Sequence, residues 1–313
     1  MLGGLGSQMF KYAFYLQIKE TDECYIDTTP YYLQEMWNGY ELERIFGIKE
    51  RDLVSFFSAK ELKELRKKEV HYQMAAGIAM EGITPGKPLL FILRGYLYPE
   101  ETKKIIKFST LSYNKVKRLC NRKNEVYDKY PLIHRTKLFS VYYDEFNHTS
   151  DKYLGGGRQK DKLRNMFQFP AFEDNRNVET ARNMLNEESV SMHIRRSDHM
   201  YDNIRLFETG YFSKATECIK EHVQNPVFYL FSDEPEWCKC HLDMLGLQRG
   251  DKIRLVDWNL RAESFRDMQL MTYCKHNILA ISSFGWWGYY LSCRNDKVVC
   301  APEGYWLEVP IHF

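Results

Sequence analysis

The chain has 313 residues, a formal net charge of +2 and 44% hydrophobic residues. This length allows one large or two ordinary domains with a sizeable core. The near-neutral charge excludes the basic footprint of a nucleic-acid-binding protein, so we expect no nucleic-acid partner. We expect no signal peptide, because the charged and apolar regions of one are not recognisable, and no apolar run is as long as a membrane span.

The cysteine pattern indicates a reducing compartment. The chain has 8 cysteines, none of which forms a C-x-x-C pair, and Cys238 and Cys240 are too close together for a zinc knuckle. Several lie in apolar runs, such as Cys300, where cysteine acts as a small hydrophobe. We therefore expect reduced thiols and a cytoplasmic protein, and leave open a peripheral place at the inner face of the membrane.

The first half of the chain is the harder half to interpret. It opens on Gly3-Gly4-Leu5-Gly6, although a glycine loop usually follows a strand, so we expect that the first strand is missing or that the chain begins within an element. The expected elements are a helix over Gln8–Lys19, a strand over Glu23–Asp27, a helix over Ser58–Glu69 capped by Ser58, a strand over Leu89–Leu97 and a helix after Pro99. Between Val126 and Gly157 the sequence predicts no element, and Gly155–Gly157 is typical of a loop.

The second half alternates strands and helices, which is typical of a parallel, doubly wound sheet. The expected strands cover residues 189–194, 226–232, 252–258, 277–282 and 297–301, and the expected helices cover 210–223, a segment from Pro235, 264–274 and 284–292. The two halves are expected to meet near Phe169-Pro170. We therefore predict an α/β protein with domains over residues 1–168 and 169–313.

His193-Ile194-Arg195-Arg196-Ser197-Asp198 follows the first strand of this half. Open α/β sheets bind ligands at the carboxyl ends of their strands. Arginine suits a pyrophosphate there, because its fork donates two parallel hydrogen bonds and stays charged. The alternative is a pair of surface arginines that form salt bridges with Asp198.

Ser282-Ser283-Phe284 follows the strand over 277–282 and opens a helix, with Ser282 or Ser283 as the expected N-cap. The free N–H groups and the dipole of a helix N-terminus attract anions. Trp286 and Trp287 are explained more simply as core residues, because large aromatic side chains mostly supply packing area.

Asp233 and Asp257 each follow a further strand of the predicted sheet. Their carboxylates suit the N–H groups of a base or the hydroxyls of a ribose, and the alternative is that each caps the following helix. Four polar sites at one edge of a sheet are the expected layout of a nucleotide site. The sequence has no Asp-x-Asp metal clamp, so arginines and helix N-termini have to neutralise a diphosphate.

Taken together, these segments resemble a known family, the bacterial α-1,2-fucosyltransferases of glycosyltransferase family 11. The resemblance lies in His193–Asp198, Phe231–Asp233, Arg266–Met271, Cys274–Ile278 and Ser282–Gly288, with Gly3–Phe10 and Tyr40–Arg44 in the first half. It is strongest between residues 189 and 306 and weakest between 110 and 165.

The resemblance implies a GT-B fold, in which an acceptor-side and a GDP-fucose-binding Rossmann-like domain face each other across a cleft. It implies transfer of L-fucose from GDP-β-L-fucose to the 2-hydroxyl of a galactoside, with inversion and with neither a metal nor another cofactor. The expected partners are GDP-fucose and a galactose-containing glycan, and the expected role is bacterial surface polysaccharide biosynthesis. The acceptor glycan and the oligomeric state are not specified by the resemblance.

The resemblance also assigns roles to residues. Arg195 is expected to bind the diphosphate during catalysis with support from Arg196, and His193 to contact the nucleoside. The remaining binding residues are expected to be Ser282, Ser283 and Phe284 at the β-phosphate, Asp233 and Asp257 at the same edge, and Gly4, Gly6, Ser7 and Gln8 over the phosphates and the fucose. Apart from the resemblance, two carboxylates are candidates for the catalytic base. One is Asp198, which ends the arginine motif and has the alternative role of orienting Arg195 or Arg196, and the other is Asp27 at the end of a predicted strand.

Two positions depart from the family pattern. Ser7 stands where the family usually has an asparagine at the phosphate, and Gly285 stands where it often has serine. Two alternatives therefore stay open beside the active enzyme. One is a catalytically weak or inactive homologue that binds a GDP-sugar or glycan, and the other is an unrelated phosphate-binding protein of Rossmann-like fold.

Overall fold

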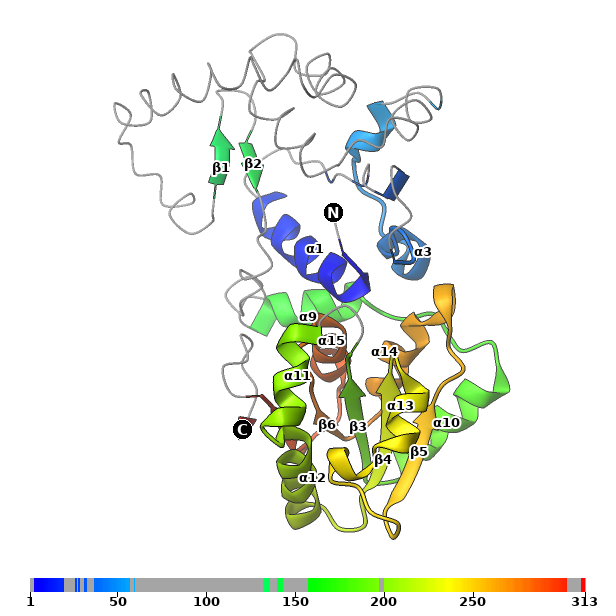
Figure 1. The fold of residues 1–313 in the computed structure, drawn as a ribbon. Helices are drawn as coiled ribbons and strands as arrows, with labels where there is room; N and C mark the ends of the chain where they lie inside the picture. The colour runs from blue at the N-terminus through cyan, green and yellow to red at the C-terminus, as the bar shows by residue number, and fades with distance from the viewer. Residues whose placement is uncertain are drawn as a thin grey trace. The chain divides into compact units, whose positions relative to one another are not determined.

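The computed structural model describes residues 3–19, 26, 28, 31–32, 37–56, 59, 132–135, 140–142, 157–196, 200–302 and 311–312. The chain forms two compact units (Figure 1). The first comprises Met1–Leu2, Ile18–Gly39 and Lys49–Thr149, and the second comprises Gly3–Gln17, Tyr40–Ile48 and Ser150–Phe313. The sequence places Gly3–Gln17 in the first domain, whereas its contacts in the structure are with the unit that holds the C-terminal sheet.

The second unit is built on a parallel sheet of six strands in the order β5-β4-β3-β6-β7-β8. The strands are β3 (Ser189–Ile194), β4 (Val227–Ser232), β5 (Lys252–Val256), β6 (His276–Ile278), β7 (Val299–Ala301) and β8 (Ile311–His312). The chain runs outward from β3 to β5 and then continues from β6 in the opposite direction. The strand order thus reverses between β3 and β6, and such switch points are where open α/β sheets bind ligands.

Helices lead to the strands and connect them (Figure 1). They are α10 (Asn175–Asn186) before β3; α11 (Met200–Glu208) and α12 (Tyr211–His222) before β4; α13 (Pro235–Cys240) and η4 (Asp243–Leu245) before β5; η5 (Arg261–Glu263) and α14 (Phe265–Met271) before β6; and α15 (Ser283–Leu291) before β7. The same unit holds α3 (Leu42–Phe46) and α9 (Gly157–Met166). It also holds α1 (Leu5–Lys19) except for the last two residues of that helix, which are assigned to the first unit. The first unit holds η1 (Leu53–Phe56) and an antiparallel pair, β1 (Leu132–Arg135) and β2 (Ser140–Tyr142).

The α/β alternation predicted for the second half is confirmed, and β3 has the predicted bounds. All six residues of β3 are buried, because a parallel strand in the middle of a sheet is covered on both faces. The side chains of β3 alternate between the two faces. Val190 and Met192 pack with Phe212 and Ile219 of α12, while Ala181 and Met184 of α10 and Leu270 and Met271 of α14 form the cluster that also holds Tyr229 and Phe231 of β4.

Four α-helices of the second unit, α3, α9, α10 and α11, were not predicted from the sequence, and β1 and β2 lie where no element was expected. The Asp174 side chain accepts a hydrogen bond from the Asn177 N–H (2.7 Å) and caps α10. The predicted start of the first helix at Gln8 is wrong, because α1 begins at Leu5. Gly6, Ser7 and Gln8 therefore belong to the first turns of a helix and not to a loop.

Several sequence predictions lie outside the described residues. These are the base candidates Asp198 and Asp27, the strand over Glu23–Asp27 except for Ile26, the greater part of the helix over Ser58–Glu69, the strand over Leu89–Leu97 and the helix after Pro99.

Candidate functional site

Arg195 lies directly after β3, where it forms an ion pair with Asp233 at the end of β4. Its Nη1 is 3.3 Å from the Asp233 Oδ2, and the side chains are 26% and 14% exposed. The other carboxylate oxygen of Asp233 accepts a hydrogen bond from the Arg196 backbone N–H (3.0 Å). Asp233 therefore joins two neighbouring strand ends. It does not cap α13, whose N-cap is Glu234, so the capping alternative for Asp233 is wrong.

Arg196 is directed toward α13. Its Nε donates to the Glu234 Oε2 (2.9 Å), and its guanidinium carbon lies 3.8 Å from the centre of the Trp237 ring. An ion pair combined with stacking on an aromatic face holds the side chain against the protein. This geometry suits the supporting role predicted for Arg196, and neither Glu234 nor Trp237 was assigned a part by the sequence.

The first turn of α15 lies after β6, on the other side of the switch point from Arg195. Ser282 is the N-cap, as predicted, and its Oγ accepts a hydrogen bond from the Phe284 N–H (3.3 Å). Ser283 is the first residue of the helix. The N–H groups at this end and the helix dipole form an electropositive edge beside the arginines.

The first turn of α1 contacts the first turn of α15, although the two are at opposite ends of the sequence. A Cβ on Gly6 would lie 2.7 Å from the Phe284 nitrogen and 2.7 Å from the Ser283 carbonyl carbon. The Ser7 Oγ lies 3.5 Å from the Ser283 Oγ. Gly4 begins the α1 turn by accepting a hydrogen bond from the Gln8 N–H (3.0 Å). Two helix N-termini thus meet, which concentrates positive potential at one place.

The two tryptophans of α15 are core residues, as predicted. Trp286 is 2% exposed and Trp287 is 0% exposed, and the ring of Phe10 in α1 lies 4.8 Å from each. The Trp287 Nε1 also donates to the Gly6 carbonyl (2.9 Å). The pair therefore fastens α1 to α15 and holds the glycine turn in place.

His193, the last residue but one of β3, lies under the start of α15. It is 5% exposed, and a Cβ on Gly285 would lie only 2.5 Å from its Nδ1. Within the described ranges this nitrogen has no hydrogen-bond partner. Burial, and after it the charge of Arg195, lower the pKa of His193 to about 4, so the imidazole is neutral at pH 7. The glycine at position 285 is thus explained by the space that His193 occupies.

The depressed pKa of His193 predicts a loss of stability in acid. Between pH 6.5 and pH 4 the unfolded chain binds a proton that the folded protein does not, so the free energy of unfolding falls as the pH falls. The contribution of His193 is about 2 kcal/mol between pH 7 and pH 5. Urea unfolding at both pH values should show a correspondingly smaller difference for His193→Gln than for the wild type.

His222→Gln, which replaces an exposed histidine, is the matched control for this measurement. Equal pH dependence of the wild type and His193→Gln would contradict the buried, neutral state of His193.

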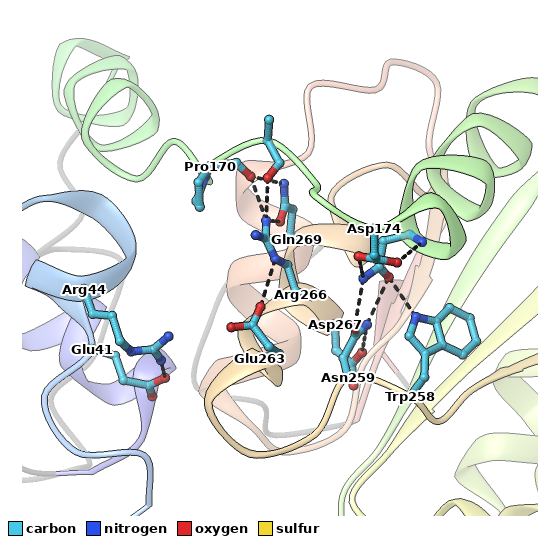
Figure 2. A network of polar contacts seen from close by, with 12 residues as sticks. Glu41, Arg44, Pro170, Asp174, Trp258, Asn259, Glu263, Arg266, Asp267 and Gln269 are labelled. Carbon is cyan, nitrogen blue, oxygen red and sulfur yellow. Dashed lines mark hydrogen bonds and ion pairs between the residues drawn. The ribbon is translucent and has the colours of Figure 1, made fainter.

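Gln8 is completely buried, and both ends of its amide are used within the protein. Its Nε2 donates to the Gly3 carbonyl (2.9 Å), and its Oε1 accepts from the Glu41 N–H (2.8 Å). Glu41 in turn forms an ion pair with Arg44 in α3 (2.8 Å; Figure 2). In this arrangement Gln8 holds the glycine turn against α3, and a direct contact with a ligand stays a prediction.

Asp257 follows β5 and pairs with cations of two helices. Its Oδ1 lies 3.6 Å from Arg176 in α10, and its Oδ2 lies 3.3 Å from the Lys239 Nζ in α13. The capping alternative is wrong for Asp257 too, because the next helical turn begins at Arg261 with Leu260 as its N-cap. The structure thus brings Arg195 and Arg196 together with Asp233, and the α1 turn together with the first turn of α15. Asp257 is engaged with Arg176 and Lys239 instead.

A polar network connects α10, the segment after β5 and α14 (Figure 2). The Asn259 Nδ2 donates to the Asp267 Oδ1 (2.8 Å) and lies 3.2 Å from the Asn177 Oδ1, which also accepts from the Trp258 Nε1 (2.9 Å). Burial raises the pKa of Asp267 to about 7, and the charge of Asp257 acts in the same direction. The sequence assigned no role to Asp267, although an acid within the apolar run 265–271 is the signal of such a network.

The raised pKa of Asp267 predicts that Asp267→Asn stabilises the protein at high pH. Above pH 7 the wild type has to hold an ionised carboxylate in a buried place, whereas the amide stays neutral and can still accept from Asn259. We expect a gain of at least about 1 kcal/mol at pH 8.5 that shrinks steadily as the pH falls from 7 toward 4, because the folded carboxyl takes up its proton near pH 7 and the unfolded one only near pH 4. Thermal unfolding at pH 5.5 and 8.5 measures it.

Asp243→Asn, at an exposed position, is the control for this pair of measurements. A gain of equal size at both pH values would contradict the titration of Asp267.

Arg266 and Gln269, in the family-like run over 266–271, serve the structure. Arg266 is buried, and its Nη1 donates to the carbonyls of Pro170 (2.8 Å) and Ala171 (3.1 Å). The Gln269 Nε2 donates to the same Pro170 carbonyl (2.9 Å; Figure 2). These bonds fasten the segment before α10, where the sequence predicted the domain boundary, to α14.

In the part of the chain that the structure describes, no group of three His, Cys, Asp or Glu side chains is arranged to hold a metal ion. Among the helices of the same residues, none combines the length and the apolar character needed to cross a membrane.

Comparison with known proteins gives one family and several relatives. The profile of the family described as "Glycosyl transferase family 11" matches residues 67–305. An alpha-1,2-colitosyltransferase of Escherichia coli is 27% identical, over 98% of this chain and 91% of that protein. The galactoside alpha-(1,2)-fucosyltransferase 2 of Rattus norvegicus is 30% identical over 33% of this chain and 29% of its own length. The O-antigen biosynthesis glycosyltransferase WbnK of Escherichia coli is 29% identical over 38% of this chain and 39% of its own length. No solved structure matches the chain.

Proposed function

Because the chain belongs to glycosyltransferase family 11, we propose that it transfers L-fucose from GDP-β-L-fucose to the 2-hydroxyl of a galactoside, with inversion and without a metal. The observation that carries the proposal is the meeting of the first turns of α1 and α15 at the switch point of the sheet, where Gly285 lies against His193, two residues before Arg195. Named fucosyltransferases among the relatives support the choice of donor.

The diphosphate is the part of the donor that this site suits best. Two helix N-termini and the guanidinium of Arg195 supply positive charge without a metal ion, and the hydroxyls of Ser7 and Ser283 add hydrogen bonds. Ser7 is shorter than the asparagine of the family, but it lies 3.5 Å from the Ser283 hydroxyl, so the two can act on the same phosphate. A neutral His193 beside them suits the uncharged nucleoside.

The chemistry follows from where charge develops. In the proposed reaction the acceptor oxygen forms a bond to the anomeric carbon on the face opposite GDP, and the bond from that carbon to the phosphate oxygen breaks. The β-phosphate gains charge, which Arg195 and the first turn of α15 stabilise. A carboxylate takes the proton of the acceptor hydroxyl, and Asp198 or Asp27 is proposed for this part. We also propose a GT-B arrangement, which would bring the acceptor to the donor from the first domain.

The function is tested by GDP release from GDP-fucose with lactose as acceptor, in the presence and absence of EDTA. We expect release in both conditions and a product with an α-1,2 linkage by NMR. Thermal stabilisation by GDP, in preference to UDP and ADP, is expected in parallel. Stabilisation by GDP without any product would favour the inactive homologue, and no preference for GDP would favour the unrelated phosphate-binding protein.

A second donor is favoured by one comparison. The relative that aligns with 98% of this chain is named a colitosyltransferase. Colitose is fucose without its 3-hydroxyl, so one diphosphate site can serve both GDP-sugars. Measuring kcat/KM with GDP-fucose and GDP-colitose under the same conditions decides between the two donors.

A further inference from the structure

Three cationic side chains gather at the C-terminal end of α15, opposite to the end in the proposed donor site. Lys160 and Arg164 come from α9, and Lys297 comes from the segment before β7. We call these three residues the cation cluster. A helix of nine residues is about 14 Å long, so α15 separates the cluster from the Ser283 end.

The cluster is ordered by the last carbonyl groups of α15 and the residue after it. The Arg164 Nη2 donates to the carbonyls of Tyr290 (3.1 Å) and Ser292 (3.2 Å). The Lys297 Nζ donates to the same Ser292 carbonyl (3.2 Å) and to that of Tyr289 (3.3 Å). Two cations from separate segments thus share one carbonyl oxygen, which holds their charges close together.

Aromatic faces complete the surroundings of the cluster. The Lys160 Nζ lies 5.6 Å from the centre of the Tyr290 ring, and the Lys297 Nζ lies 4.6 Å from that of Tyr289. Lys160 is exposed and makes no hydrogen bond within the described residues. Its position over the ring therefore leaves its N–H groups available to a ligand.

Within the described residues, no carboxylate balances the charges of the cluster. A helix C-terminus carries about −0.5 of an elementary charge, which is far less than three cations supply. None of the three forms an ion pair with a carboxylate of the described residues. Burial, then Arg164 and Lys160, lower the pKa of Lys297 to about 8, while Cys293 has a small opposite effect. The repulsion within the cluster thus adds to the effect of burial on the pKa of Lys297.

We propose that the cation cluster binds a tetrahedral oxyanion, the phosphate group of a ligand distinct from the sugar donor. Among the described residues, the third N–H of Lys297, the Nη1 of Arg164 and the ammonium of Lys160 donate no hydrogen bond. A dianion placed among them removes the repulsion and receives charge-assisted hydrogen bonds from two segments. Free phosphate and the phosphate of a lipid headgroup share this chemistry.

Sulfate is the probe for the site, because its charge is constant between pH 6 and pH 9. We expect sulfate to bind the full-length protein, and Lys160→Met to weaken binding at least threefold. Lys160→Met removes no hydrogen bond among the described residues and changes an exposed side chain, so we expect the variant to fold. Lys214→Met, at an exposed position of α12, removes the same charge elsewhere and should leave the affinity unchanged. Equal affinities of the wild type and Lys160→Met would overturn the proposal.

The titration of Lys297 gives an independent readout. Sulfate affinity should fall at least threefold between pH 7 and pH 9, because Lys297 loses its proton through about pH 8 while Arg164 and Lys160 stay charged. NMR of 15N-labelled lysine side chains should show the pKa of Lys297 rising when sulfate is added. A pKa that does not respond to sulfate would place the anion elsewhere.

Vesicles distinguish the two sources of phosphate. Flotation with phosphatidylcholine vesicles that contain phosphatidylglycerol, compared with phosphatidylcholine alone, tests the lipid headgroup. Binding that depends on Lys160 would assign the site to an anionic membrane surface. Sulfate binding without flotation would assign it to a small phosphorylated ligand, and the absence of both would reject the site. None of these measurements uses fucosyl transfer, so they stand apart from the proposed function.

Discussion

Replacing Arg195 with alanine is expected to lower kcat by about 10²–10³-fold in a donor-saturated assay. Arg195 is the cation that we place at the β-phosphate, where charge increases as GDP departs. An interaction that grows in the transition state affects kcat, whereas one that serves binding alone affects KM. GDP release with lactose as acceptor, measured at saturating GDP-fucose, is the assay.

The fold should survive this substitution. The Arg195–Asp233 ion pair is partly exposed, and such pairs contribute little to stability. Asp233 also keeps its hydrogen bond from the Arg196 N–H. Arg254→Met is the control. Arg254 lies on β5, forms an ion pair with Glu187 (2.6 Å) and has no role in the proposed site. Turnover of Arg195→Ala within a few-fold of the wild type would remove Arg195 from the mechanism.

Replacing Gly6 with alanine is expected to separate the first turns of α1 and α15. The new Cβ would lie 2.7 Å from backbone atoms of Ser283 and Phe284, which have no flexible end that can move aside. Such overpacking costs about 1–3 kcal/mol of the free energy of unfolding. This exceeds the gain of about 1 kcal/mol that alanine otherwise brings over glycine inside a helix. GDP affinity should fall at least tenfold, because both helix N-termini face the proposed phosphate.

Gly250→Ala is the matched control, because a Cβ there meets no atom within 4 Å. We expect its stability and its GDP affinity to equal those of the wild type. Chemical unfolding and calorimetric titration with GDP measure both quantities for the two variants. Wild-type values for Gly6→Ala would show that α1 does not contact α15 in the way described.

The sequence alone predicted the second half of the protein well, for reasons that are local. Apolar runs of five or six residues between amphipathic segments report parallel strands covered by helices, and β3 was found with the predicted bounds. Since all strands of a parallel sheet end at one edge, the polar residues after β3, β4 and β6 were expected near one another. The N-cap role of Ser282 and the core positions of Trp286 and Trp287 likewise depend on residue type and on neighbours in the chain.

The same local signals failed where glycines or polar residues make up part of a helix. α1 begins three residues before its predicted start. The prediction was wrong because glycines next to an apolar segment are typical of a loop. α10 begins after Asp174, a standard N-cap residue, but its polar composition hid the periodicity of its buried residues, Asn177, Ala181 and Met184. Asp233 and Asp257 show a different limit of sequence-based prediction. Both resemble N-cap residues in the sequence, but in the structure they form ion pairs with cationic side chains.

What the sequence by itself determined is the family, the order of strands and helices in the second half, and the edge at which its polar residues gather. Only the tertiary structure decided which of these residues meet. Ser7 reaches Ser283 across 276 positions of the chain, Arg195 pairs with Asp233, and His193 loses its charge under Gly285. Sequence patterns report the backbone and burial of a residue among its neighbours, whereas contacts and pKa shifts depend on which distant segments fold against it.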